Sequence, residues 1–360
     1  MVSIPQPYPL RNVTDDNLMG LAKALWGWEF CESCQRAPGK GCSLQTCQGI
    51  RWKKLESFFD YYKQSAASYI PDFIAGIPPA IKCHDDLFAI IQLLKANPGT
   101  IKSELIDAHF ATDGGRCQPS ISADQLEKGL QPISWEDNMS LTQFLSGIFP
   151  TVDSSSSERD VDLDKTLHAI NNLVTARKLI KVARLTFVPT DDLRDHLRLD
   201  PHDGTIRLYH HTAFLKESLI ASQRVAGHIP RQLAIEVLDS IQRTLFLTTA
   251  DGSLHLHALV AKHRMDPDSL TFEPSTYQLE GEGGCGYKYL QPRLAILYEE
   301  IANPTPRGLF ERWIEKKSGA RYVMMATLGG LGIAILLGVL SLAVSIFQAW
   351  VGWQQWQHPV

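Results

Sequence analysis

A long uncharged run near the C-terminus, residues 323–347, restricts this chain more than any other feature. As an α-helix it would extend for about 37 Å, whereas the hydrocarbon core of a bilayer is about 30 Å thick. Each Leu, Ile, Val or Phe favours the bilayer centre by roughly 0.3–0.6 kcal/mol. The alternative is a core helix of a soluble protein, but such a helix is usually shorter and has a polar side. The run therefore predicts a transmembrane helix over residues 322–350, followed by a short tail, 351–360.

The two flanks of the run differ in charge. Tyr322 precedes it, and an aromatic belt of Trp350, Trp353 and Trp356 follows. Five basic residues precede it, and no Lys or Arg follows: Arg307, Arg312, Lys316, Lys317 and Arg321. The positive-inside rule places residues 1–321 in the cytosol. We expect a tail-anchored protein; a GPI signal would need an N-terminal signal peptide, which is not seen.

Two further patterns concern the membrane. Small residues recur every four positions along one face of the predicted span: Ala326, Gly330, Ala334 and Gly338. Such a stripe permits close helix–helix contact, so self-association in the bilayer is expected, although Gly and Ala are also common in such helices. Residues 304–321 predict an amphipathic juxtamembrane helix, which either lies on an anionic leaflet or packs on the soluble body.

The bulk of the chain is that of a globular protein. Of its 360 residues, 44% are hydrophobic and 21% charged, with a net charge of −4, which points neither to nucleic acid nor to an acidic substrate. The mean hydropathy of −0.11 excludes a multi-span membrane protein. Acidic residues near the N-terminus argue against a mitochondrial presequence. A cytosolic body would keep its seven cysteines reduced.

The periodicity of the body predicts a mainly α fold with a few short strands. An N-terminal helical region, 1–150, is followed by a Ser- and Asp-rich linker, 151–164, and by a second α+β region, 165–303. Helices are expected from Asp16, Trp52, Asp85, Ile101, Ser122, Ser140, Leu163, Ala213, Pro230 and Leu290. Strands are expected near residues 184–189 and over Thr205–Tyr209, with a helix capped by Thr190 between them.

Four cysteines form the main chemical constellation, with the spacing C-x2-C-x7-C-x4-C: Cys31, Cys34, Cys42 and Cys47. Four thiolates this close can surround one tetrahedral Zn²⁺, so one structural zinc is expected. A catalytic zinc is not expected, because the sequence offers no ligand set that leaves a coordination position open. The alternatives are four independent thiols, or disulfides if the topology is inverted. Cys83 or His84 could supply a ligand to this zinc from a distance, but Cys83 is better interpreted as a buried thiol.

Other candidate chemistry is weak. We expect His255, His257 and His263 to be exposed or half-buried. We expect His210 and His211 to point to opposite sides of a strand. Asp191 and Asp192 are expected to favour a helix start. No P-loop, HExxH, GxSxG, HRD or GxGxxG motif occurs. Three short helices over residues 85–130 resemble half a winged helix, but a single lysine on the third, Lys128, disfavours nucleic acid.

Two stretches, LTFVPTDDLRDHLRLD and NPTPRGLFERWIEKKSGARYVMMATL, resemble segments of filamentous-fungal proteins that end in a single membrane span. The resemblance runs through much of residues 160–360. No activity is established for that family, so it implies a fungal endomembrane location and no catalytic residues.

These observations favour a non-enzymatic adaptor with a cytosolic body and a lipid-embedded anchor. The endoplasmic reticulum or a connected membrane is expected rather than the mitochondrial outer membrane, because the span is long and no basic tail follows it. The alternatives are a membrane-tethered enzyme with an unrecognised site and a membrane-held, winged-helix-like nucleic-acid-binding factor.

Overall fold

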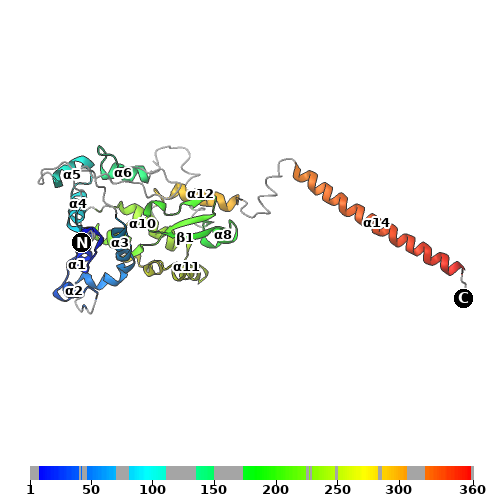
Figure 1. The fold of residues 1–360 in the computed structure, drawn as a ribbon, viewed down its shortest axis with the longest axis horizontal. Helices are drawn as coiled ribbons and strands as arrows, with labels where there is room; N and C mark the ends of the chain where they lie inside the picture. The colour runs from blue at the N-terminus through cyan, green and yellow to red at the C-terminus, as the bar shows by residue number, and fades with distance from the viewer. Residues whose placement is uncertain are drawn as a thin grey trace, which may run out of the picture. The chain divides into compact units, whose positions relative to one another are not determined.

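The computed structural model describes residues 8–39, 42, 47–69, 81–110, 135–149, 173–223, 227, 229–247, 250–282, 286–305 and 321–357. Within these residues the protein is mainly helical with one three-stranded sheet, which confirms the predicted fold class (Figure 1). The chain divides into two compact units, Met1–Pro304 and Thr305–Val360. The predicted linker 151–164, the helix expected from Ser122 and residues 306–320 of the juxtamembrane segment lie outside the described residues.

Six α-helices are described in the N-terminal region: α1 (Asp15–Trp26), α2 (Glu32–Arg36), α3 (Glu56–Ser68), α4 (His84–Ala96), α5 (Lys102–Phe110) and α6 (Leu141–Ile148). Helix α1 begins with a capping box, in which Thr14 and Asn17 satisfy each other's backbone N–H groups. It ends at Gly27, whose φ of 68° is the left-handed conformation that glycine adopts without strain. The predicted helices from Asp16, Asp85, Ile101 and Ser140 are therefore confirmed, and most of the one from Trp52 is α3.

The sheet has the order β1-β3-β2 and lies in the central region. Strand β1 (Thr186–Thr190) pairs parallel with β3 (Thr205–Tyr209), and β2 (Leu199–Asp200) pairs antiparallel with β3. The edge position of β1 accommodates Pro189, which has no N–H to donate. Both longer strands confirm the sequence prediction, whereas the two-residue β2 has no pattern by which it could be predicted.

Helices surround this sheet: α8 (Ala176–Lys181), α9 (Thr212–Ala221), α10 (Arg231–Asp239), α11 (Ala250–His263) and α12 (Gln291–Ala302). Helix α10 continues as a π-helical segment, η5 (Ser240–Leu245), and short 3₁₀ turns occupy Pro9–Arg11 (η1), Gln48–Leu55 (η2), Pro267–Leu270 (η6) and Pro274–Thr276 (η7). Helix α11 contacts β1, and α12 contacts β2. Phe187 of β1 and Ile206 and Leu208 of β3 are buried, whereas Thr186 and Val188 on the other face of β1 stay exposed.

One hydrophobic cluster joins the N-terminal helices to the central region. The ring of Phe58 in α3 stacks on Phe214 of α9 at 4.5 Å, and Trp26 of α1 meets both rings edge-on. The indole N–H of Trp26 donates to the Ser218 hydroxyl at 3.2 Å, so its polar atom is satisfied inside the cluster. This shared core places α3 directly against the end of β3 and the start of α9.

The second unit contains one long helix, α14 (Arg321–Gln357), of 37 residues. Its segment Gly330–Val351 has 22 residues, a mean hydropathy of 2.5 and no buried share, unlike the core helix of a soluble protein. At about 1.5 Å per residue it is about 33 Å long, enough to cross a bilayer. The predicted membrane-spanning helix is thus present in length and composition. Self-association through its small-residue stripe stays a prediction.

Candidate metal centre

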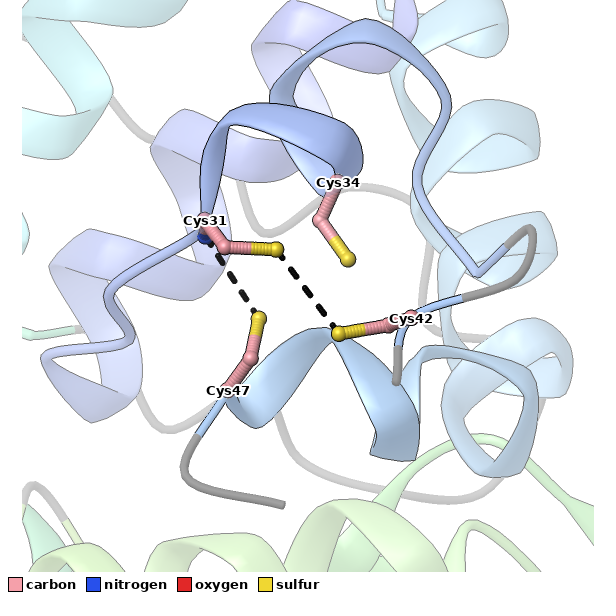
Figure 2. Close-up of side chains that lie close together, drawn as sticks. All are labelled: Cys31, Cys34, Cys42 and Cys47. Atoms are coloured by element: carbon pink, nitrogen blue, oxygen red, sulfur yellow. Dashed lines mark hydrogen bonds between the residues drawn. The ribbon is translucent and has the colours of Figure 1, made fainter. Parts of the chain in front are cut away.

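The four predicted cysteines come together at the junction of α2 and η2 (Figure 2). Cys31 occupies the N-cap of α2, and Cys34 follows one turn later inside that helix. Cys47 occupies the N-cap of η2, and Cys42 lies between the two elements in sequence. The start of α2 thus supplies two thiols, the start of η2 supplies one and the segment between them supplies the fourth, and the four sulfur atoms lie close together.

The distances between these thiols suit a metal and not a disulfide. All four Sγ atoms lie within 4.8 Å of one another, and those of Cys31 and Cys42 are 3.7 Å apart. Tetrahedral Zn²⁺ with bonds of about 2.3 Å holds its sulfur ligands about 3.8 Å apart, whereas a disulfide bond is about 2.05 Å. All four are free cysteines. The cluster can therefore bind a metal ion, as the spacing predicted.

The thiols are not equivalent in their electrostatics. Burial raises the pKa of Cys34, which is fully enclosed. Burial also acts to raise the pKa of Cys47, but hydrogen bonds from the backbone N–H groups of Cys31 and Gly49 outweigh it and lower that pKa to about 7. Cys47 is thus the thiol that ionises most readily near neutral pH, and a bound cation would stabilise the thiolate form of all four.

Sequence reasoning missed Gly49, which lines this centre. A Cβ at this position would lie 2.6 Å from the sulfur of Cys34 and 3.3 Å from that of Cys47. Only glycine therefore lets the backbone of η2 approach the sulfurs this closely. No spacing pattern could have identified the residue, because its role depends on the packing of η2 against α2.

The variant Gly49→Ala is expected to weaken metal binding at this centre by about 10-fold or more, as disturbed outer contacts of metal ligands do. The added methyl group must displace Cys34 or Cys47. Competition with a chromophoric chelator measures the change. Gly99→Ala is the matched control, since a Cβ there meets nothing within 4 Å. An unchanged metal affinity in Gly49→Ala would contradict the proposed packing.

The other sequence candidates lie apart from this centre. Among the described residues, the cysteine centre contains only those four cysteines. Cys83 lies half-buried at the N-cap of α4 instead. His84 is buried, and its imidazole contacts the Tyr62 hydroxyl at 2.7 Å and the Asn12 carbonyl at 3.3 Å. The histidines of α11 are exposed or half-buried, as predicted. Neither group contributes a ligand.

The prediction for His210 and His211 is wrong. They follow the last residue of β3, so strand alternation no longer separates them, and their rings lie 4.1 Å apart. Both Nε2 atoms contact the same oxygen of Asp191, at 2.9 Å from His210 and 2.8 Å from His211. Asp191 therefore binds histidines and does not begin a helix. Together these three side chains form a second group able to approach a metal ion.

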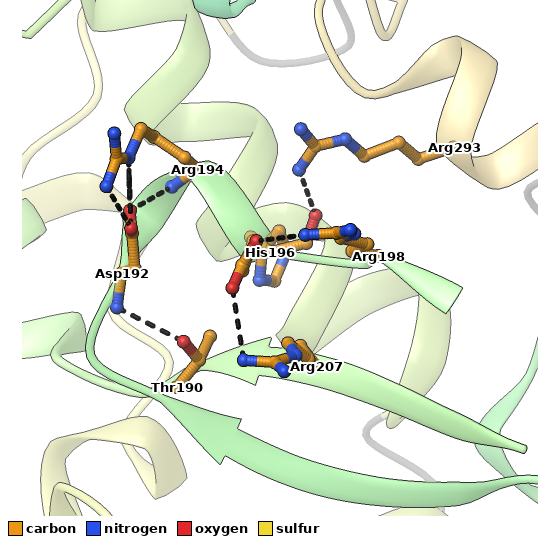
Figure 3. Close-up of polar contacts among 8 residues, drawn as sticks. Thr190, Asp192, Arg194, His196, Arg198, Arg207 and Arg293 are labelled. Atoms are coloured by element: carbon orange, nitrogen blue, oxygen red, sulfur yellow. Dashed lines mark hydrogen bonds and ion pairs between the residues drawn. The ribbon is translucent and has the colours of Figure 1, made fainter. Parts of the chain in front are cut away.

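The segment between β1 and β2 is held by a separate network of arginines and carboxylates (Figure 3). The helix predicted after Thr190 is a single 3₁₀ turn, η4 (Leu193–Asp195), and Asp192 caps it by accepting from the Arg194 N–H at 2.9 Å. The cap is Asp192 and not Thr190, because Thr190 accepts from the Asp192 N–H instead. The buried Asp195 pairs with Arg198 and Arg207, each at 3.2 Å.

A buried histidine completes this network. Burial and the nearby Arg293 lower the pKa of His196 to about 3, so the ring is neutral. It accepts from the Tyr209 N–H at 3.1 Å and contacts the Ser240 hydroxyl at 2.8 Å, while its carbonyl accepts from Arg293. Asp192 and Asp195 each pair with arginines, and Arg293 donates to a backbone carbonyl, which indicates a structural role in holding the β1–β2 connection on the sheet.

No family model, curated protein or solved structure matches this chain.

Proposed function

We propose that this protein is a single-pass membrane protein, anchored by α14, whose helical body works on the cytosolic side as an adaptor for other proteins. The observation that carries the proposal is the apolar segment Gly330–Val351, which is exposed along its length. An exposed apolar surface of this size is unfavourable in water and favourable in lipid. A bilayer therefore supplies the partner that this surface requires.

The orientation follows from the charges around α14. Five basic residues occupy positions 307–321, and residues 322–360 contain no Lys or Arg. Basic residues near a span stay in the cytosol, which puts Met1–Pro304 on the cytosolic side. The length of the span and the absence of positive charge after it favour the endoplasmic reticulum or a connected membrane over the mitochondrial outer membrane.

Glycosylation provides a test of this orientation. A sequon added after Val360 on a polar spacer is expected to be modified in cells, while the native sequons at Asn12 and Asn138 stay unmodified. A shift on gels that is reversed by endoglycosidase measures the modification. Sugar on Asn12 or Asn138 and none on the added site would invert the proposed topology.

The cysteine centre supports a structural zinc in the adaptor body. Four thiolate ligands complete the coordination of a tetrahedral ion, so no coordination position remains for substrate or water. The centre connects α2 to η2, and η2 leads directly into α3 of the shared core. A bound zinc would therefore stabilise the packing of α2 and η2 on the shared core, without taking part in a reaction.

A further inference from the structure

A second polar cluster, formed by Ser57, Asp191, His210 and His211, lies where α3 packs against the end of β3. The Ser57 hydroxyl is 3.4 Å from Nδ1 of His211, and Nε2 of His211 is 2.8 Å from the Asp191 carboxylate. Ser57 and His211 are 154 residues apart in sequence. Neither the metal centre nor the membrane anchor involves these groups.

The surrounding contacts determine which atom carries each proton. The backbone N–H of Asp266 donates to Nδ1 of His210 at 3.2 Å, so the proton of that ring is on Nε2 and points to Asp191. Hydrogen bonds from His210 and His211 lower the pKa of Asp191, which is therefore ionised and can only accept. Nε2 of His211 must then donate to it. This leaves the lone pair of Nδ1 directed at Ser57, whose hydroxyl must be the donor.

The His211 ring is enclosed in this orientation by neighbouring aromatic rings. The side chain is 1% exposed, and the rings of Phe58, Tyr61 and Tyr209 surround it at 5.3–6.1 Å. Burial lowers the pKa of His211, which keeps the ring neutral and able to accept a proton. Asp191 is 52% exposed and Ser57 half-buried, so the cluster has access to solvent. Ser57, His211 and Asp191 thus form a row of contacting side chains: a nucleophile, a base and an orienting carboxylate. This is the arrangement of an activated serine.

We propose that Ser57 is a nucleophile, activated by His211 as general base and positioned through Asp191, that cleaves uncharged carboxylic esters. Its oxygen attacks the ester carbonyl carbon while its proton moves to Nδ1 of His211. The tetrahedral intermediate collapses, and the departing alkoxide takes that proton and leaves as an alcohol. Water then attacks the acyl-serine by the same route, which releases the acid and restores the hydroxyl. An uncharged ester is favoured because the Asp191 carboxylate would repel an anion.

A bound metal is the alternative for this cluster. Metal-binding histidines normally donate their second ring N–H to an acceptor, whereas His210 receives an N–H from Asp266 on that nitrogen. A metal on Nε2 of His210 would therefore have to remove the only proton of the ring. The proton positions favour the serine over the metal.

The test uses the full-length protein in detergent, an alkyl fluorophosphonate as probe and p-nitrophenyl butyrate as substrate. We expect the probe to form an adduct on Ser57, located by mass spectrometry, and ester hydrolysis to be lost in Ser57→Ala. Ser65→Ala, an exposed serine of the same helix, is the matched control and should react as the parent does. Asp191→Asn should slow labelling by roughly 100-fold, as loss of base catalysis does, and Asp191→Glu should restore part of the rate.

Two results would overturn the proposal. One is the absence of an adduct on Ser57, with equal hydrolysis by the parent and Ser57→Ala. The other is a second equivalent of bound metal in the purified protein that is lost in Asp191→Asn, which would make the cluster a metal site. The serine proposal does not rest on the anchor or on the cysteine centre, so its failure would leave the proposed membrane location and zinc site unaffected.

Discussion

Deleting Tyr322–Val360 is expected to move the protein from the membrane fraction entirely into the soluble fraction. The deletion removes the apolar segment Gly330–Val351, in which each Leu, Ile, Phe or Val favours the bilayer by roughly 0.3–0.6 kcal/mol. The unit Met1–Pro304 keeps its own buried core. We expect the full-length chain to resist extraction with alkaline carbonate and the truncated chain to stay in the supernatant after ultracentrifugation.

A matched control separates lipid affinity from the particular sequence of α14. Replacing Gly330–Val351 with a Leu/Ala helix of the same length should restore carbonate resistance, because hydropathy and length are the only properties that insertion requires. A truncated body that still pellets with membranes and resists carbonate would show that the anchor has been misassigned.

Replacing Cys31 and Cys34 together with serine is expected to abolish metal binding at the cysteine centre. The purified body should hold about one zinc per chain, as a four-thiol site does, and the double variant none. The unfolding free energy should fall by about 3 kcal/mol or more, since binding of a structural metal contributes directly to folding. For a domain of this size that lowers the Tm by roughly 6 °C or more. Elemental analysis and thermal unfolding measure the two effects.

The control for this variant is Cys83→Ser, which replaces a free cysteine outside the cysteine centre. It should keep both the zinc and the Tm. Treating the parent with a strong chelator should reproduce the loss of stability of the double variant. A body that contains no metal, and whose melting is the same in Cys31→Ser plus Cys34→Ser, would remove the zinc proposal.

Local patterns in the sequence were sufficient for much of the fold. Strand β3 occupies the predicted residues, Thr205–Tyr209, and α1 begins one position before the predicted Asp16. Both depend on short-range periodicity and capping, which act within a few residues. The metal centre could also be predicted, because all four thiols lie within one short segment and their spacing alone permits them to bind one metal ion.

Two predictions about the segment after β1 and the end of β3 were wrong. Sequence reasoning separated His210 from His211 by strand alternation, but β3 ends at Tyr209, and Asp191 then binds both rings. Thr190 was expected to cap a helix, but Asp192 caps a shorter turn instead, and the buried Asp195 of that turn pairs with two half-exposed arginines. The histidine contacts could not be predicted from one segment, because they depend on which side chains the sheet brings together.

The sequence by itself determined that α14 is apolar enough to span a bilayer and that four thiols can share one metal ion. Both properties belong to single segments, and their free energies are set by composition and spacing. Only the tertiary structure decided that α3 packs against the end of β3, which brings Ser57 to His211 across 154 residues, and that Gly49 lies against the sulfur of Cys34. Burial of aromatic rings from distant helices in one shared core determines those positions, and that burial exists only once the chain has folded.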